Sequence, residues 1–255
     1  MGDLIHSLVA PACVYNQYNW KTNFYIAEAF DKFETSLQRS IEELQPILAY
    51  QKYINSFEKF RNGIHEIDVD LNMFRLTDIA NYHANYTFLS LLKGLGTIQI
   101  PFNFKYLDAP VLDEYKDYLI ISRKPGRTEW NDFVEMQYKH IMSKFEKKLF
   151  ISFNGKDYEK FPLKNDVDLL VVEELFDFVK IVNSGSLFLT NCSGPLCFAS
   201  ALNVNRVAET GSWIAGRYKG DNQFSDKSEI FNDNGTIYTK NTKYLLKANW
   251  WKELW

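Results

Sequence analysis

The pattern of apolar and polar positions predicts helices along the first half of the chain. Between residues 24 and 50, apolar side chains recur every three or four positions, as on one face of an α-helix: Phe30, Phe33, Leu37, Ile41, Leu44 and Leu48. We expect Pro46 to kink or divide this helix, because proline has no backbone N–H to donate. The same spacing continues to Phe60, so two helices or one bent helix are predicted to end near Gly63.

Three further helices are predicted, at residues 77–93, 128–145 and 166–184. Each range opens with a Thr or Asp that can cap the first turn, and each has apolar side chains at helical spacing. Residues 97–127 are irregular and carry Pro101, Pro110, Pro125 and Gly126, which predicts a connector. Short extended pieces are expected within it, at residues 97–100 and 118–122.

The second half of the chain predicts strands in antiparallel pairs. Residues 149–153 and 156–161 flank Asn154-Gly155, a dipeptide favoured in the two-residue turn of a β-hairpin. Beyond Gly185 the apolar runs become short, and Asn234-Gly235 provides a second turn of this kind. A small antiparallel sheet is therefore expected here.

These elements predict an α+β fold, with a mainly helical N-terminal half followed by a mixed half that holds the antiparallel sheet. We expect residues 1–148 to form the helix-rich region and residues 149–255 to form the α+β region. The two regions can also make one continuous domain.

Composition and charge exclude several classes of protein. The 255 residues are 46% hydrophobic, enough for a substantial core, and a net charge of −3 gives no overall field that attracts nucleic acid or anionic lipid. No uninterrupted apolar run approaches the 18 residues or so of a membrane span. The three cysteines leave at least one unpaired, and no basic segment precedes the apolar run near the amino terminus. We therefore expect a soluble, cytoplasmic protein with reduced thiols.

The segment from Phe60 to His65 brings a cation, an amide and an imidazole into close succession. Arg61, Asn62 and His65 in this hexapeptide resemble the Arg-Asn and His element of the HEPN superfamily, whose helical bundles include ribonucleases. The resemblance covers residues 60–65 alone. It implies a metal-independent endoribonuclease that works as a dimer.

In that ribonuclease, Arg61 would stabilise charge on the scissile phosphate and Asn62 would help to fix the geometry. His65 would exchange a proton with the 2′-hydroxyl or the leaving oxygen. The structural alternative is that Arg61 and Asn62 cap the end of a helix and His65 makes a local hydrogen bond.

Other candidate sites are weaker on chemical grounds. Asp68 and Asp70 alternate as on one face of a strand, but we interpret them as solvated carboxylates. Cys192 and Cys197 have no second cysteine pair or nearby histidine, so no metal site is predicted. The glycines match no nucleotide-binding motif, and no cofactor is predicted.

The leading functional hypothesis is an interaction or assembly protein. Aromatic residues make up 16% of the chain, and the C-terminal segment carries Trp250, Trp251 and Trp255, which are typical of a surface that docks on a partner. A component of a defence or immunity system and a viral structural assembly both fall in this class, with a protein partner or a homo-oligomer. The alternative is the HEPN-like endoribonuclease acting on RNA.

Overall fold

The computed structural model describes residues 2–27, 36–76, 91–92, 94, 104–211, 228–233, 236–237 and 243–246. The helices are α1 (Gly2–Ser7), α2 (Val9–Tyr18), α3 (Leu37–Ala49), α5 (Asp132–Met142), α6 (Lys156–Glu159), α7 (Leu175–Ser184) and α8 (Gly194–Leu202). Short 3-10 helices are η1 (Leu71–Leu76), η3 (Asp113–Tyr115) and η4 (Lys164–Asp166). The strands are β1 (Thr22–Ile26), β2 (Ile54–Lys59), β3 (Leu119–Ser122), β4 (Lys148–Ser152), β5 (Asp168–Val171), β6 (Leu187–Asn191), β7 (Arg206–Thr210) and β8 (Ser228–Asn232).

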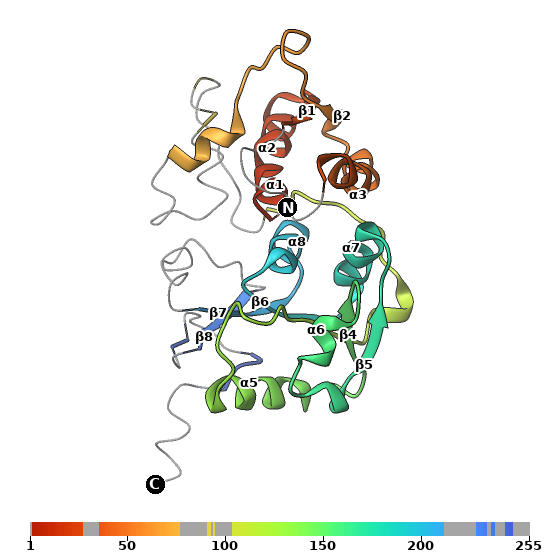
Figure 1. Ribbon diagram of the computed structural model, residues 1–255, viewed down its shortest axis with the longest axis vertical. Coiled ribbons are helices and arrows are strands. Elements are labelled where there is room, and N and C mark those ends of the chain that lie inside the picture. The colour runs from red at the N-terminus through yellow and green to blue at the C-terminus, as the bar shows by residue number, and fades with distance from the viewer. Residues whose placement is uncertain are drawn as a thin grey trace.

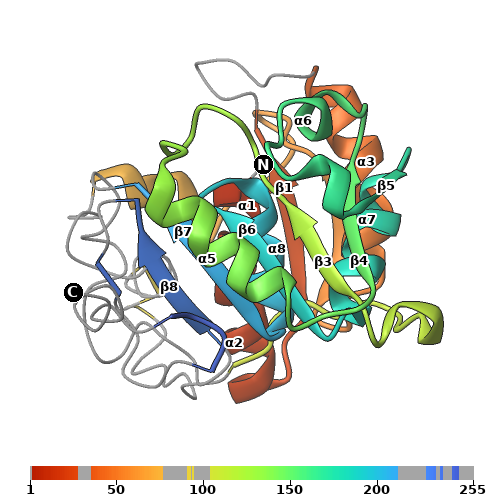
Figure 2. The same ribbon diagram turned by 90° about the horizontal axis from the view of Figure 1, so that it is seen from below.

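Six of these strands form one parallel sheet in the order β5-β4-β3-β6-β7-β8. In sequence order, this sheet begins with β3 in the middle and continues outward through β4 to β5. The chain then returns to place β6 on the other side of β3 (Figure 2). This is the doubly wound arrangement, in which the direction of winding reverses at a switch point between β3 and β6. A crevice opens beyond the carboxyl ends of the strands at such a point.

Helices cover both faces of this sheet, as a parallel sheet requires. In Figure 1, α7 and α8 lie between the sheet and the N-terminal helices, and α5 lies on the opposite face. The strand side chains alternate accordingly: Ile120 and Phe188 pack with α7 and α8, whereas Leu119 and Ile121 pack with α5. Both faces of β3 are thus buried.

The N-terminal part adds a second, two-stranded parallel sheet, in which α3 connects β1 to β2. Ser36 caps α3 by accepting a hydrogen bond from the Arg39 backbone N–H at 3.2 Å. Helix α1 packs on α8, and α3 packs on α7. No helix within the described ranges is long and apolar enough to cross a membrane.

The predicted continuation of the first helix to Phe60 is wrong, because residues 54–59 form β2. Helix α3 confirms the prediction for residues 37–49, with Pro46 inside it, whereas residues 24–26 belong to β1 and residues 28–35 lie outside the described residues. The apolar positions after it suit a strand as well as a helix: Phe57 is buried against Phe24 of β1, with ring centroids 6.2 Å apart. Gly63, with φ 77°, lies in the turn that follows β2.

The predicted antiparallel sheet is also wrong, and with it the α+β class. Asn154-Gly155 leads from β4 into α6 instead of closing a hairpin, and residues 166–184 divide into β5 and α7. Short apolar runs buried on both faces lack the alternation of a half-exposed strand, and this hides parallel pairing from the sequence. The fold is α/β. One isolated antiparallel bridge joins Phe231 of β8 to Ile237, which belongs to none of the named strands.

Two local predictions are confirmed. The extended piece at residues 118–122 is β3, and the helix predicted at residues 128–145 is α5, although Asn131 caps it in place of Thr128. The prediction of a mainly helical N-terminal half is wrong, because β1, β2 and β3 all lie before residue 148. The division of the chain at that residue stays a prediction. The helix predicted at 77–93, apart from residues 91 and 92, lies outside the described residues, as do the extended piece at 97–100 and Asn234-Gly235.

Gly185, directly after α7, gives a prediction about stability. A Cβ atom at this position would lie 2.5 Å from Cγ1 of Ile120 and 3.3 Å from the Tyr118 carbonyl oxygen. We expect Gly185→Ala to lower the free energy of unfolding by about 1–3 kcal/mol, because a buried strand must shift. Urea unfolding measures this change. Gly94→Ala, with no described atom within 4 Å of its Cβ, is the control, and an equal loss in both variants would contradict the prediction.

Candidate functional site

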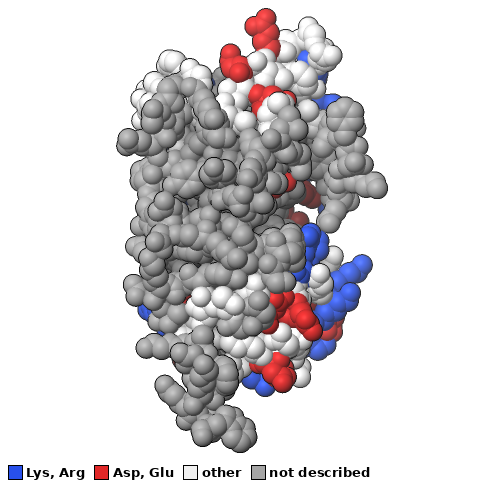
Figure 3. All heavy atoms as spheres, turned by 90° about the vertical axis from the view of Figure 1, so that its left-hand side faces the viewer, with Lys and Arg blue, Asp and Glu red and all other residues white. Residues whose placement is uncertain are grey.

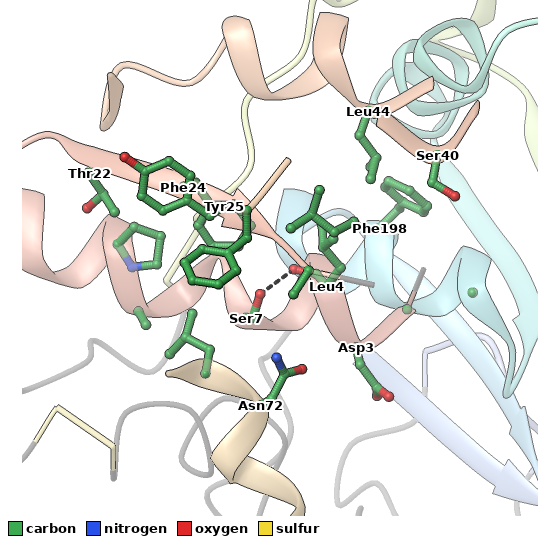
Figure 4. A pocket seen from close by; sticks show the side chains of 18 of the residues that line it. Asp3, Leu4, Ser7, Thr22, Phe24, Tyr25, Ser40, Leu44, Asn72 and Phe198 are labelled. Atoms are coloured by element: carbon green, nitrogen blue, oxygen red, sulfur yellow. Dashed lines mark hydrogen bonds between the residues drawn. The ribbon is translucent and has the colours of Figure 1, made fainter. Parts of the chain in front are cut away.

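A large cleft, with a volume of about 1420 Å³, opens at the switch point of the sheet. Its floor comes from the segments that follow β3 and β4 and from the first turns of α8, and its opposite wall comes from α1, β1, α3 and residues 60–72. Figure 4 shows Leu4, Leu44 and Phe198, from α1, α3 and α8, among the side chains that line it. The fold therefore places a cavity where doubly wound sheets bind their ligands.

The loop that follows β3 supplies cations to this cleft. We call residues 123–128 the basic loop; Lys124 and Arg127 in it line the cleft. Gly126 has φ 75°, a left-handed conformation that glycine adopts without strain. The exposed Arg127 makes no hydrogen bond or ion pair with any other residue that the structure describes. Its guanidinium is available to bind an anion.

A buried ion pair anchors the start of the basic loop. Arg123 donates from Nε and Nη2 to the two carboxylate oxygens of Glu209 on β7, at 2.8 and 2.9 Å. Glu209 is completely buried and also accepts a hydrogen bond from the Tyr138 hydroxyl at 2.9 Å. The Trp130 ring lies 4.8 Å from the guanidinium carbon of Arg123. This bidentate contact reaches from the end of β3 past β6 to β7.

Burial and charge keep this network in one protonation state. Burial alone lowers the pKa of Arg123, but the hydrogen bond and the charge of Glu209 outweigh it, and the pKa is raised. Burial raises the pKa of Tyr138 well above its usual value, and the Glu209 carboxylate raises it further. Tyr138 thus remains a hydrogen-bond donor and Arg123 remains a cation at neutral pH.

The N-terminus of α8 faces the same cleft, where Gly194 and Pro195 line it. Nothing described lies within 4 Å of a Cβ atom built on Gly194, so this turn of the backbone is open to a ligand. The dipole of a helix and the N–H groups of its first turn favour an anion at this end. The helix terminus and the basic loop thus attract the same kind of ligand.

Asp3, in the first turn of α1, brings a carboxylate to the cleft opposite these groups. Its neighbour Gly2 abuts α8: a Cβ atom on Gly2 would lie 2.9 Å from Sγ of Cys197 and 3.9 Å from Cα of Gly194. The first turns of α1 and α8 are therefore in contact, and Figure 4 labels Asp3 among the side chains that line the cleft. A carboxylate here can accept a proton from a bound hydroxyl.

More carboxylates line the cleft farther from α8. Glu66, Asp68 and Asp70 are exposed in the segment after β2, and acidic side chains are visible at that end of the molecule in Figure 3. Asp157 of α6 is half-buried, and burial raises its pKa, while the positive charges of Lys124 and Lys160 oppose this rise.

Arg61, Asn62 and His65 of the HEPN-like hexapeptide do not line the cleft. His65 stacks on Tyr25 with ring centroids 4.3 Å apart, and its Nδ1 accepts a hydrogen bond from the Arg61 backbone N–H at 3.1 Å. Arg61 and Asn62 are exposed, and Phe60 alone among the six lines the cleft. The local hydrogen bond predicted for His65 is thus present, but it lies in a turn after strand β2 and not at the end of a helix.

The remaining predictions concern the C-terminal tryptophans, metal ligands and the cysteines. Trp250, Trp251 and Trp255 lie outside the described residues, so their interface role stays a prediction. Among the residues that the structure describes, no group of three or more His, Cys, Asp or Glu side chains could hold a metal ion. Cys13 is buried, and burial raises its pKa to about 12, which makes its thiol unreactive.

Comparison with known proteins identifies the fold. No protein-family model and no curated protein matches the chain. Among solved structures, E. coli heptosyltransferase WaaC with ADP has a TM-score of 0.64 at 11% identity, covering 100% of this chain and 95% of that one. The chain thus has the fold of this structure.

Two further structures agree with this fold. A glycosyl transferase of family 9 from Veillonella parvula has a TM-score of 0.56 at 13% identity, covering 91% of this chain and 82% of that chain. E. coli ADP-heptose lps heptosyltransferase II has a TM-score of 0.55 at 12% identity, covering 90% and 87% of the two chains.

These likenesses correct the functional hypotheses drawn from the sequence. The HEPN resemblance is wrong, because a parallel sheet with helices on both faces is not a helical bundle. The ribonuclease hypothesis rested on that resemblance and is wrong with it. The interpretation as an interaction, assembly, defence-system or viral structural protein is overturned as well, because the neighbours in fold are sugar-transferring enzymes.

Proposed function

We propose that the protein is a glycosyltransferase that moves a sugar from a nucleoside diphosphate donor to a hydroxyl group of an acceptor. The observation that carries this proposal is the cleft at the switch point. Its floor holds the N-terminus of α8 and the cations of the basic loop, and its opposite wall holds the carboxylate of Asp3. Glycosyl transfer to a hydroxyl requires groups that stabilise an anionic leaving group and a group that accepts the proton of the hydroxyl.

The floor of the cleft suits the diphosphate of the donor. Arg127 can hold phosphate oxygens with two parallel N–H donors, and Lys124 adds a second positive charge. The first turn of α8 supplies backbone N–H groups and the positive end of its dipole. Together these groups would stabilise the negative charge that develops on the diphosphate as its bond to the sugar breaks.

An aromatic platform beside this floor suits the base of a nucleotide. Phe153 follows the carboxyl end of β4, lines the cleft and is 46% exposed. Its ring stacks on Phe178 of α7, with the centroids 5.3 Å apart, which holds it in place. A nucleobase can stack on the free face of such a ring, and β4 is the strand next to β3 and its phosphate-binding loop.

The opposite wall suits the acceptor. Asp3 would accept the proton of the acceptor hydroxyl as its oxygen attacks the anomeric carbon of the donor sugar. One carbon–oxygen bond forms to the acceptor, the bond from the sugar to the diphosphate breaks, and the nucleoside diphosphate leaves with the electron pair. The reaction needs no oxidant, reductant or further reactant.

The names of the neighbouring structures suggest the first donor to test. They refer to ADP and to ADP-heptose, so we propose an ADP-linked sugar as the donor. A cytoplasmic location and a protein partner or homo-oligomer formed through the C-terminal tryptophans stay predictions from the sequence. Light scattering of the full chain and of a Trp255→Ala variant tests the second of these.

Titration calorimetry with ADP tests the proposal directly. We expect the protein to bind ADP, and Arg127→Ala to weaken that binding by roughly tenfold or more, because a hydrogen bond to a charged group contributes about 1.5–3 kcal/mol. Arg39→Ala is the matched control, since Arg39 pairs with Glu43 on α3 and does not line the cleft. The absence of binding to every nucleoside diphosphate at millimolar concentration would refute the proposal.

A further inference from the structure

Asn191, the last residue of β6, lies at the centre of the hydrogen bonds beneath the cleft. Its side chain is completely buried. Nδ2 donates to the Lys124 carbonyl oxygen at 2.8 Å and to Oγ1 of Thr128 at 3.3 Å. Oδ1 accepts from the Lys124 backbone N–H and from the Ser193 hydroxyl, both at 3.1 Å. One amide thus contacts both the basic loop and the residue that precedes α8.

These four bonds use the whole capacity of the amide. An asparagine side chain has two N–H donors and one oxygen with two lone pairs, and all four are occupied here. Asn191 therefore has no group left for a ligand. Any effect of this residue on the donor must act through the two elements that it holds.

The partners of Asn191 are backbone groups and the hydroxyls of short side chains, so its hydrogen bonds fix the position of the backbone itself. Both polar groups of the Lys124 backbone are fixed, so the chain direction between Arg123 and Arg127 is set by this contact. Thr128, at the other end of the loop, is held by Asn191 and also by Nη2 of Arg123 at 3.2 Å. The bond to Ser193 ties the start of α8 to the same amide.

We propose that Asn191 is a positioning residue that fixes the basic loop and the N-terminus of α8 relative to each other, so that both bind one diphosphate. This inference rests on the proposed function. The inference gives a reason for a fully buried amide at the end of a central strand: two separate elements form the anion site, and the amide holds them together. A loss of register between these elements would weaken the binding of a diphosphate more than that of a monophosphate, which needs fewer donors.

Asn191→Asp is the sharpest variant, because it keeps the shape of the side chain. The carboxylate accepts hydrogen bonds but cannot donate to the Lys124 carbonyl or to Thr128, and it places a negative charge beneath the anion site. Ser193→Ala is the milder variant, since it removes the hydroxyl that contacts Oδ1 and the carbonyl oxygen of Asn191. The Ser193 backbone N–H keeps its bond to that carbonyl oxygen at 2.8 Å, and the basic loop stays attached. Ser193→Ala remains informative if Asn191→Asp fails to fold.

Thr190→Val provides the matched control. Thr190 is also completely buried on β6, but its side chain points to the opposite face of the sheet, and its hydroxyl donates to the Asn191 carbonyl oxygen. Its side chain lies on the face that α7 and α8 cover, but among the described residues it makes no hydrogen bond to the basic loop or to α8. This variant removes a buried hydrogen bond from the same strand and leaves all four bonds of the Asn191 side chain in place.

The experiment is calorimetric titration of each variant with ADP and with AMP. We expect Asn191→Asp to weaken ADP binding by tenfold or more and to reduce the preference for ADP over AMP, Ser193→Ala to do so by severalfold, and Thr190→Val to keep both values. Wild-type affinities for ADP and AMP that persist in folded Asn191→Asp, or in Ser193→Ala if that variant alone folds, would overturn the inference. Wild-type protein that does not bind ADP would instead refute the proposed function.

Discussion

Glu209→Ala is expected to lower the free energy of unfolding by about 3–5 kcal/mol, because it leaves the charge of Arg123 buried without its partner. Both side chains are nearly inaccessible to solvent, at 5% for Arg123 and 0% for Glu209. The variant also removes the acceptor of the Tyr138 hydroxyl, which has no access to water at this depth. Urea unfolding followed by circular dichroism measures the loss.

Two further variants make this test specific. Glu43→Ala removes a carboxylate from an exposed pair with Arg39, and we expect a cost below about 1 kcal/mol. The double variant Glu209→Leu with Arg123→Met removes both charges, and it should be more stable than Glu209→Ala. A loss below about 1 kcal/mol in Glu209→Ala would show that Arg123 finds another partner.

Asp3→Asn is expected to lower kcat by about 10²- to 10⁴-fold while leaving the affinity for ADP nearly unchanged. The amide keeps the size of the carboxylate but cannot accept the proton of the acceptor hydroxyl. The donor diphosphate is proposed to lie on the floor of the cleft, against α8 and the basic loop, so its binding does not depend on this proton. Initial rates with a sugar donor give kcat, and calorimetry gives the affinity.

The control for this variant is Asp68→Asn, which removes an exposed carboxylate from the same wall, farther from α8. We expect its kcat to stay within about threefold of the wild-type value, since this exposed carboxylate is not proposed to contact the reacting atoms. Full activity in Asp3→Asn would exclude this residue as the base. Equal losses in both variants would point to an effect of the overall charge of the wall on acceptor binding.

The sequence predicts the helices of this protein better than its strands, for a physical reason. Helix α5 is amphipathic and carries a cap, and its pattern follows from one buried and one solvated face. Strands β3 and β6 are buried on both faces, so Leu119 to Ile121 and Leu187 to Leu189 form apolar runs without alternation. Such a run does not specify the direction of its neighbours, and the parallel order depends on contacts far apart in the chain.

The candidate site was missed for a similar reason. Asp3 and Asn191 have no local motif; their importance comes from α8, which lies against the first and follows the second. One signal was present: Ser193-Gly194-Pro195 follows a short apolar run, and proline in the first turn is typical of a helix start. The short apolar runs beyond Gly185 predict strands instead, so α8 and the candidate anion site at its N-terminus were not predicted. The hexapeptide at residues 60–65 gave the predicted site instead, although His65 hydrogen-bonds only to the Arg61 backbone within a local turn.

The strand order also sets a schedule for synthesis of the chain. Strand β3 is central in the finished sheet, yet its neighbour β6 leaves the ribosome only after β4, β5 and α7. Until β6 arrives, one side of β3 is an open edge with unpaired N–H and C=O groups between apolar side chains. The nascent protein thus passes through an interval in which β3 can pair with another chain. High expression rates should favour aggregation during that interval, and slower elongation or a chaperone that covers the edge should favour the native sheet.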